Sequence, residues 1–125
     1  MRRIVLDSSV LIDASRADPR ALAFLRDAAT SAEVWSIAPV RTEVLWNLRP
    51  EEVATTRRVF DAISWLDVTT SLADRAGAFG QQYGKSHGLG VVDATLAAAA
   101  EEISGDVATL NVRDFPMFPD LQRPY

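Results

Sequence analysis

Short apolar runs that are typical of buried strands alternate with longer helical patterns along the whole chain. The first run, Ile4–Leu6, is rich in β-branched side chains and is flanked by polar residues. Two parallel strands can be joined only by a long crossover, usually a helix. Such alternation therefore predicts an α/β fold, a parallel sheet covered by helices on both faces. The predicted strands are 4–6, 33–38, 64–68 and 106–112, and a short terminal strand at 121–125 brings the sheet to about five.

Helix start and stop signals lie between these runs. Asp18 followed by Pro19 is typical of an N-cap and a first helical residue, and Pro50 followed by acids opens another helix in the same way. Ser71 with Asp74 resembles a capping box, whereas the glycine-rich stretch 84–90 predicts a loop. The predicted helices are 9–16, 19–31, 40–48, 50–63, 71–83 and 91–102.

The composition excludes several classes of protein. The chain has 125 residues, which predicts a single domain spanning 1–125, and it has no cysteine, so disulfides and cysteine-based zinc sites are excluded. This fits a reducing compartment, and we expect a cytoplasmic protein. The apolar stretches are too short for a signal peptide or a membrane span. The net charge of −4 does not indicate a general nucleic-acid binder.

Acidic side chains follow the predicted strands at the points where functional groups collect in parallel α/β sheets. The carboxyl ends of the strands meet at one edge, and helices that run antiparallel to the strands begin at that same edge. Asn111 also falls at this edge, at the carboxyl end of the fourth strand. Four acids from distant parts of the sequence are therefore expected in one crevice: Asp7, Glu43, Asp93 and Asp114.

Three of these acids have a simple structural explanation. Asp7 could serve only as the N-cap of the following helix, Glu43 could lie on an exposed helix face, and Asp114 could sit in an Asp turn. Asp93 is different because it is the only charged residue in Val91–Ala100, a helical segment that is apolar on every side. Such a helix is expected to be buried, and a buried carboxylate takes up a proton or finds a cation.

A cluster of carboxylates requires positive charge. Two carboxylates ~4 Å apart repel by ~4 kcal/mol at an effective dielectric constant near 20. The single Lys85 and single His87 lie in the glycine-rich stretch, outside the acidic pattern. A hard divalent cation, Mg²⁺ or Mn²⁺, prefers carboxylate oxygens and water and is often completed by substrate phosphate. The expected chemistry is hydrolysis of a phosphodiester bond by metal-activated water.

Four sequence motifs occur in an order and spacing that resemble a known family. They are "VLDSSVLID", "APVRTEVLW", "VVDATLAAAA" and "ATLNVRDF". Together they resemble the PIN domain, and within it the VapC-type toxin ribonucleases of VapBC toxin–antitoxin pairs. The resemblance implies a Rossmann-like three-layer α/β/α sandwich with a five-stranded parallel sheet. It also implies an acidic pocket for Mg²⁺ or Mn²⁺ and endonuclease activity on RNA, which makes the chain a hydrolase.

The family's functional positions can be transferred to matching residues of this chain. Asp7 and Asp93 correspond to direct metal ligands, and Glu43 corresponds to the second acid, which orients or deprotonates water. Ser9 matches a supporting polar position. All four acids, Asp114 included, are candidates for both metal binding and catalysis.

The fourth position departs from the family pattern. Many PIN domains have an acid where Asn111 stands, so either Asn111 or Asp114 fills this position, the latter through a water. Thr109 is expected to orient an acid by a hydrogen bond. Arg113, beside the fourth motif, is a candidate for substrate binding.

The resemblance also implies partners. A cognate VapB-type antitoxin is expected to insert a C-terminal segment, often with an arginine, into the pocket. The substrate is RNA, with transfer RNA as the family default. A homodimer is expected, and a heterotetramer or larger assembly with the antitoxin, in the cytoplasm of a prokaryote.

Two alternatives compete with the nuclease hypothesis. Other α/β phosphoryl-transfer folds are disfavoured. A haloacid-dehalogenase-like enzyme needs a second acid where Ser9 stands, and a response-regulator receiver needs a lysine at the end of a late strand, whereas Lys85 lies in the glycine-rich stretch. The other alternative is a catalytically weak or inactive PIN-fold module that acts mainly by binding protein, for which Asn111 is the only indication. The tryptophans are expected to be core or interface residues and not platforms for base stacking: Trp35, Trp46 and Trp65.

Overall fold

The computed structural model describes residues 1–125 and contains one parallel sheet with four strands in the order β3-β2-β1-β4. The strands are β1 (Arg2–Leu6), β2 (Ala32–Ile37), β3 (Ser64–Leu66) and β4 (Asp106–Ala108). The helices are α1 (Ser8–Ser15), α2 (Pro19–Ser31), α3 (Ala38–Trp46), α4 (Val53–Asp61), α5 (Thr70–His87) and α6 (Val91–Glu102). Two 3₁₀ turns, η1 (Pro50–Glu52) and η2 (Val112–Asp114), complete the chain. The predicted α/β class is confirmed.

The central strand is β1, which pairs with β2 on one side and β4 on the other. Val5 lies opposite Trp35 of β2 and Val107 of β4. Residues Ile4–Leu6 are all buried, as expected for a parallel strand with helices on both faces. The first motif of the sequence therefore enters the middle of the sheet, and Asp7 emerges at its carboxyl edge.

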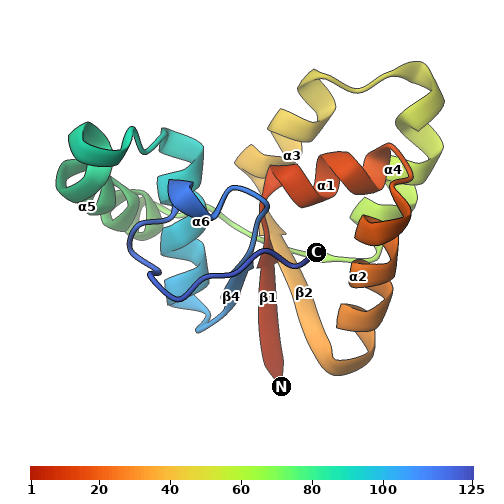
Figure 1. The fold of residues 1–125 in the computed structure, drawn as a ribbon. Helices are drawn as coiled ribbons and strands as arrows, with labels where there is room; N and C mark the ends of the chain where they lie inside the picture. The colour runs from red at the N-terminus through yellow and green to blue at the C-terminus, as the bar shows by residue number, and fades with distance from the viewer.

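Helices cover the sheet from two sides. In Figure 1, α5 and α6 lie together on one side of the strands, and α1, α2 and α4 lie on the other. The sheet between them makes the three-layer sandwich that was predicted. None of the helices has the combination of length and apolar character that is required to cross a bilayer.

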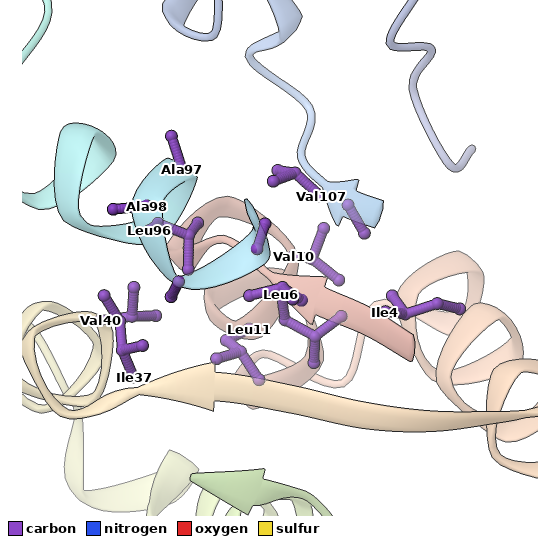
Figure 2. Packing of buried hydrophobic residues seen from close by; sticks show 14 of the residues in the cluster. Ile4, Leu6, Val10, Leu11, Ile37, Val40, Leu96, Ala97, Ala98 and Val107 are labelled. Carbon is purple, nitrogen blue, oxygen red and sulfur yellow. The ribbon is translucent and has the colours of Figure 1, made fainter. Parts of the chain in front are cut away.

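The core lies between β1, β2 and the helices that pack on them. Figure 2 shows Leu6, Leu11, Val40 and Leu96 in this layer, contributed by β1, α1, α3 and α6. The small side chains of Ala97–Ala100 are buried, so α6 can approach both α5 and the sheet closely. This packing explains why the alanine-rich helix has almost no polar face.

The sheet has one strand fewer than expected, because residues 121–125 do not form a strand. Pro124 has no N–H to donate to a ladder. The terminal side chain is used elsewhere: Tyr125 donates a 2.9 Å hydrogen bond to Asp13 of α1, and Arg20 lies over its ring. The segment therefore packs by side chains against α1 and α2.

Several element boundaries differ from the predictions, and the largest differences have a physical reason. Pro50 opens η1, so α4 begins only at Val53. The N-cap of α5 is Thr69, whose hydroxyl accepts from the Leu72 N–H, and not Ser71. The helix then continues through the predicted loop to His87, because packing against α6 outweighs the weak helix propensity of glycine.

Gly88, at φ +64°, ends α5 in the left-handed conformation that glycine adopts without strain. The fourth strand is also shorter than predicted and ends at Ala108. Beyond it, Thr109 turns its hydroxyl away from the sheet and toward Asp7.

Candidate functional site

Asp7 lies at the carboxyl edge of the sheet, between β1 and α1. Its N–H donates a 2.9 Å hydrogen bond to the carbonyl of Ala108, which continues the β1–β4 ladder by one residue. The side chain is 3% exposed. Asp7 occupies the N-cap position of α1, yet its carboxylate makes no capping hydrogen bond. N-capping of α1 therefore explains where Asp7 lies in the chain but not what its carboxylate binds.

Two hydroxyl groups hold the Asp7 carboxylate. The Thr109 hydroxyl donates to Oδ2 over 2.6 Å, and the Ser9 hydroxyl donates to the same oxygen over 3.0 Å. The Leu110 N–H donates to Ser9 Oγ, and the Asn111 N–H donates to Thr109 Oγ1. Charge-assisted bonds of this kind fix the carboxylate in one orientation. They leave Oδ1 without a hydrogen bond from the protein.

Asp93 lies in the first turn of α6 and is half-buried. Burial, and to a smaller extent the negative charges of the other three acids, together raise the pKa of its carboxyl group to about 7. Those charges belong to Asp7, Asp114 and Glu43, in decreasing order of effect. The other three predicted acids, which come from distant parts of the sequence, therefore lie within electrostatic reach of Asp93.

The remaining acids approach from either side. Glu43 is half-buried on α3, and Asp114 is half-buried in η2. Neither carboxylate is used in an ion pair or in a hydrogen bond to another side chain. Both are therefore free to accept a proton or to bind water or a cation.

The side chains of four further residues considered in the sequence analysis form no hydrogen bond or ion pair with the acids. Asn111 and Arg113 are exposed, and Arg113 forms no ion pair. Lys85 and His87 lie in the last turn of α5. His87 pairs through Nδ1 with the Ser86 hydroxyl and has no contact with an acid.

The donor set fits a cation that keeps most of its water. No group of three or more His, Cys, Asp or Glu side chains is placed so that together they could hold a metal ion, so at most two carboxylates could bind a cation directly. Mg²⁺ is usually bound by one or two carboxylates, with waters and substrate phosphate filling the other positions. The unpartnered Oδ1 of Asp7 and the raised pKa of Asp93 both indicate carboxylates that a divalent cation would stabilise.

A cavity of about 850 Å³ adjoins the acids along α3. Glu43 lines it, and so does Trp46, which is 81% exposed and was expected in the core or an interface. A place beside Glu43 was not predicted for this residue from the sequence. The spacing of Glu43 and Trp46, three positions apart on one helix, was the available signal, because such residues share a face. A second, apolar cavity between α2 and α4 is lined by none of the four acids.

Comparison with known proteins gives a consistent result. Residues 4–119 match the PIN domain family. The chain is 37% identical over 123 residues to Ribonuclease VapC19 of Mycobacterium tuberculosis, covering 97% of this chain and 98% of that protein. It is 34% identical over 127 residues to Ribonuclease VapC10 of the same organism, covering 98% and 92%. Among solved structures, a toxin–antitoxin complex from Klebsiella pneumoniae superposes with a TM-score of 0.76 at 21% identity, covering 98% of each chain.

Proposed function

Because the chain belongs to the PIN-domain family, and within it to the VapC-type ribonuclease toxins, we propose that it is a Mg²⁺- or Mn²⁺-dependent endoribonuclease. The observation that carries this proposal is the environment of Asp7. A buried carboxylate is held by Thr109 and Ser9, and it lies close enough to Asp93 for its charge to raise the Asp93 pKa, as the charges of Asp114 and Glu43 also do. A purely structural acid would need neither the other acids nor a free oxygen.

Asp7 and Asp93 would hold the cation, and Asp114 would contribute through a water. A divalent cation held there would supply Lewis acidity and offset the negative charge that develops on the phosphate. Thr109 and Ser9 keep the Asp7 carboxylate in place, so that it does not have to reorganise during the reaction.

Glu43 is proposed as the base. It accepts a proton from the attacking water while the new oxygen–phosphorus bond forms and the bond to the leaving nucleotide breaks. Its carboxylate has no other partner, so it is available for this step. Arg113 is exposed beside Asp114 and would contact a substrate phosphate.

The proposed biological role is that of the toxin in a toxin–antitoxin pair. The relatives are named VapC ribonucleases, and the superposed structure is a toxin–antitoxin complex. A VapB-type antitoxin would neutralise this chain by placing a basic side chain among the acids, where it would relieve their repulsion. We further propose a cytoplasmic homodimer that forms larger assemblies with the antitoxin and acts on RNA such as transfer RNA.

The direct test is cleavage of RNA by purified wild-type protein and by Asp7→Asn. We expect wild-type cleavage in Mg²⁺ or Mn²⁺, none in EDTA, and a loss of at least a hundred-fold in Asp7→Asn, in line with the removal of a principal electrostatic group (about 10²–10³-fold). Asp27→Asn is the matched control, because Asp27 is an exposed acid on α2. Full activity of Asp7→Asn or in EDTA would refute the proposal. A wild-type protein that is inactive but binds its antitoxin would favour the non-catalytic module.

A further inference from the structure

Trp46 differs from the other two tryptophans in its exposure, its packing and the hydrogen bonding of its indole. Trp35 and Trp65 pack against the core, and the Nε1–H of each donates a 3.1 Å hydrogen bond, to Glu33 and to the Phe60 carbonyl respectively. Trp46 is 81% exposed, lies outside the core cluster, and its Nε1–H has no acceptor in the protein. An indole so exposed contributes little to stability, which suggests that it serves a ligand.

The cavity beside Trp46 reaches one of the four acids directly, because Glu43 lines it. Ser8 and Val92 also line it, and each is the sequence neighbour of another acid, Asp7 and Asp93 respectively. Because Glu43 and Trp46 share one face of α3, a group that rests on the indole lies beside the proposed base. At about 850 Å³, the cavity is within the size range of pockets for small ligands.

The lining of this cavity suits a nucleobase. Ile12, Val68 and Val92 give it apolar walls. The Asn47 amide and the Ser8 hydroxyl also line it, and neither side chain has a hydrogen-bond partner within the protein. An amide can both donate to and accept from the edge of a base, and an aromatic ring stacks on the base's face.

We propose that Trp46 is a stacking platform for a base of single-stranded RNA whose neighbouring phosphate lies at the acids. This inference rests on the proposed ribonuclease function and assigns a substrate-positioning residue to it. A chain with a net charge of −4 gains little from general attraction to phosphate, so stacking supplies affinity that charge does not. Base–aromatic stacking of this kind is independent of sequence.

The test compares Trp46→Ala, Trp46→Phe and Leu45→Ala in steady-state cleavage of a mixed-sequence single-stranded RNA. Leu45 is the matched control, since it is an exposed apolar neighbour on α3 that does not line the cavity. We expect Trp46→Ala to raise KM between about five-fold and about a hundred-fold while kcat changes little, the range that loss of one stacked base produces. Trp46→Phe should restore most of the loss, and Leu45→Ala should resemble wild type.

Salt dependence and sedimentation test the alternative that Trp46 lies in a contact between two copies of the chain. Trp46→Ala should leave the slope of affinity against salt unchanged, because no phosphate contact is removed. It should also leave the sedimentation coefficient unchanged. An unchanged KM in Trp46→Ala overturns the proposal. So does a parallel loss in Trp46→Ala and Leu45→Ala with a shift to a lighter species, which would assign this face to a second copy.

A binding experiment separates failure of this inference from failure of the proposed function. In Asp7→Asn protein, the same RNA should quench indole fluorescence, and the quenching should disappear when Trp46→Phe is added. If wild-type protein cleaves no RNA, the proposed function fails, but this quenching still decides whether Trp46 stacks on a base. Absence of quenching in Asp7→Asn overturns the stacking proposal, whatever the cleavage assay gives.

Discussion

The Thr109 hydroxyl donates a 2.6 Å hydrogen bond to Asp7 Oδ2 across 102 positions of the sequence. It joins the residue that follows β4 to the residue that follows β1, at the edge where these two strands are paired. The same hydroxyl oxygen accepts from the Asn111 N–H. A single side chain therefore fixes both the carboxylate and the start of the loop that carries Asp114.

Replacing Thr109 by valine keeps the shape of the side chain and removes its hydroxyl. We expect a loss of about 1.5–3 kcal/mol in the free energy of unfolding, the range for a hydrogen bond to a charged group, because Asp7 is buried. Cleavage should fall by about ten-fold or more, since a supporting partner is lost. Thr109→Ser should retain most of both quantities. Denaturant unfolding and initial rates measure the two effects, and wild-type stability in Thr109→Val would contradict the assigned bond.

Replacing Asp93 by asparagine should stabilise the metal-free protein at alkaline pH. Its folded pKa of about 7 lies above the value of about 3.9 expected in the unfolded chain, so ionised Asp93 disfavours folding. The penalty is complete above pH 7, shrinks as pH falls, and is absent below about pH 4. Allowing for solvent screening, roughly 1 kcal/mol, or about 4 °C in Tm, is expected at pH 8 in EDTA.

The control for this change is Asp74→Asn, which alters an exposed acid on α5. Its effect on Tm should be small and should not depend on pH. A stabilisation by Asp93→Asn that is equal at pH 8 and pH 4 would show that charge is not its cause.

Replacing Asp114 and Asn111 one at a time distinguishes the two candidates for the fourth position of the proposed metal site. Asp114 raises the pKa of Asp93 by its negative charge, whereas Asn111 is exposed and neutral. We expect Asp114→Asn to lower the pKa of Asp93, measured by NMR titration of the metal-free protein, and to weaken Mn²⁺ binding measured by calorimetry. Asn111→Ala should change neither. The opposite pattern would assign the fourth position to Asn111.

Proton competition should make cation binding depend on pH. Binding of Mn²⁺ requires the ionised form of Asp93, whose pKa is about 7 without metal. Affinity measured by calorimetry should therefore fall as pH decreases from 8 to 6, and protons should be released on binding. In Asp93→Asn the residual affinity should be weak and nearly independent of pH over this range. Equal affinities at pH 8 and pH 6 in wild type would contradict a role for Asp93 as a ligand.

Gly105 is required by packing beside β1. A Cβ atom there would lie 2.9 Å from Val5 Cγ2 and 3.3 Å from the Arg3 carbonyl oxygen. We expect Gly105→Ala to lower the free energy of unfolding by about 1–3 kcal/mol, as overpacking does. Gly77→Ala is the matched control, because nothing lies within 4 Å of its added Cβ, and on a helix it should stabilise by about 0.5–1 kcal/mol. Urea unfolding of both variants tests the pair.

Local patterns predicted the parts of the fold that local physics determines. The strands at β1, β2 and β3 and the helix after Asp18 were identified from apolar runs and a capping residue. The end of α5 was not, because its extension to His87 depends on packing against α6 and not on the residues of the segment itself. The prediction of a terminal strand at 121–125 was wrong for a similar reason, since the Tyr125–Asp13 hydrogen bond joins residues that are far apart in the sequence.

The acids of the candidate site could be selected from the sequence, because strand ends and an isolated charge in an apolar helix are local features. Whether the Asp7 carboxylate caps α1 or is available to a ligand could not be predicted, since a capping aspartate and a ligand aspartate have the same backbone conformation. Trp46 was expected in the core or an interface; its exposure excludes the core, and this exposure could not be read from the sequence because it depends on how α3 packs. The metal and the roles of the acids stay predictions.

The pairing of Asp7 with Thr109 has a consequence for the timing of synthesis. A ribosome that has made β1, α3 and most of α6 has produced three of the acids but not the hydroxyl that holds the first of them. Until β4 emerges and pairs with β1, the Asp7 carboxylate lacks its Thr109 hydrogen bond. If the chain is the proposed ribonuclease, we therefore expect activity only late in its own translation, which leaves an interval for an antitoxin to bind.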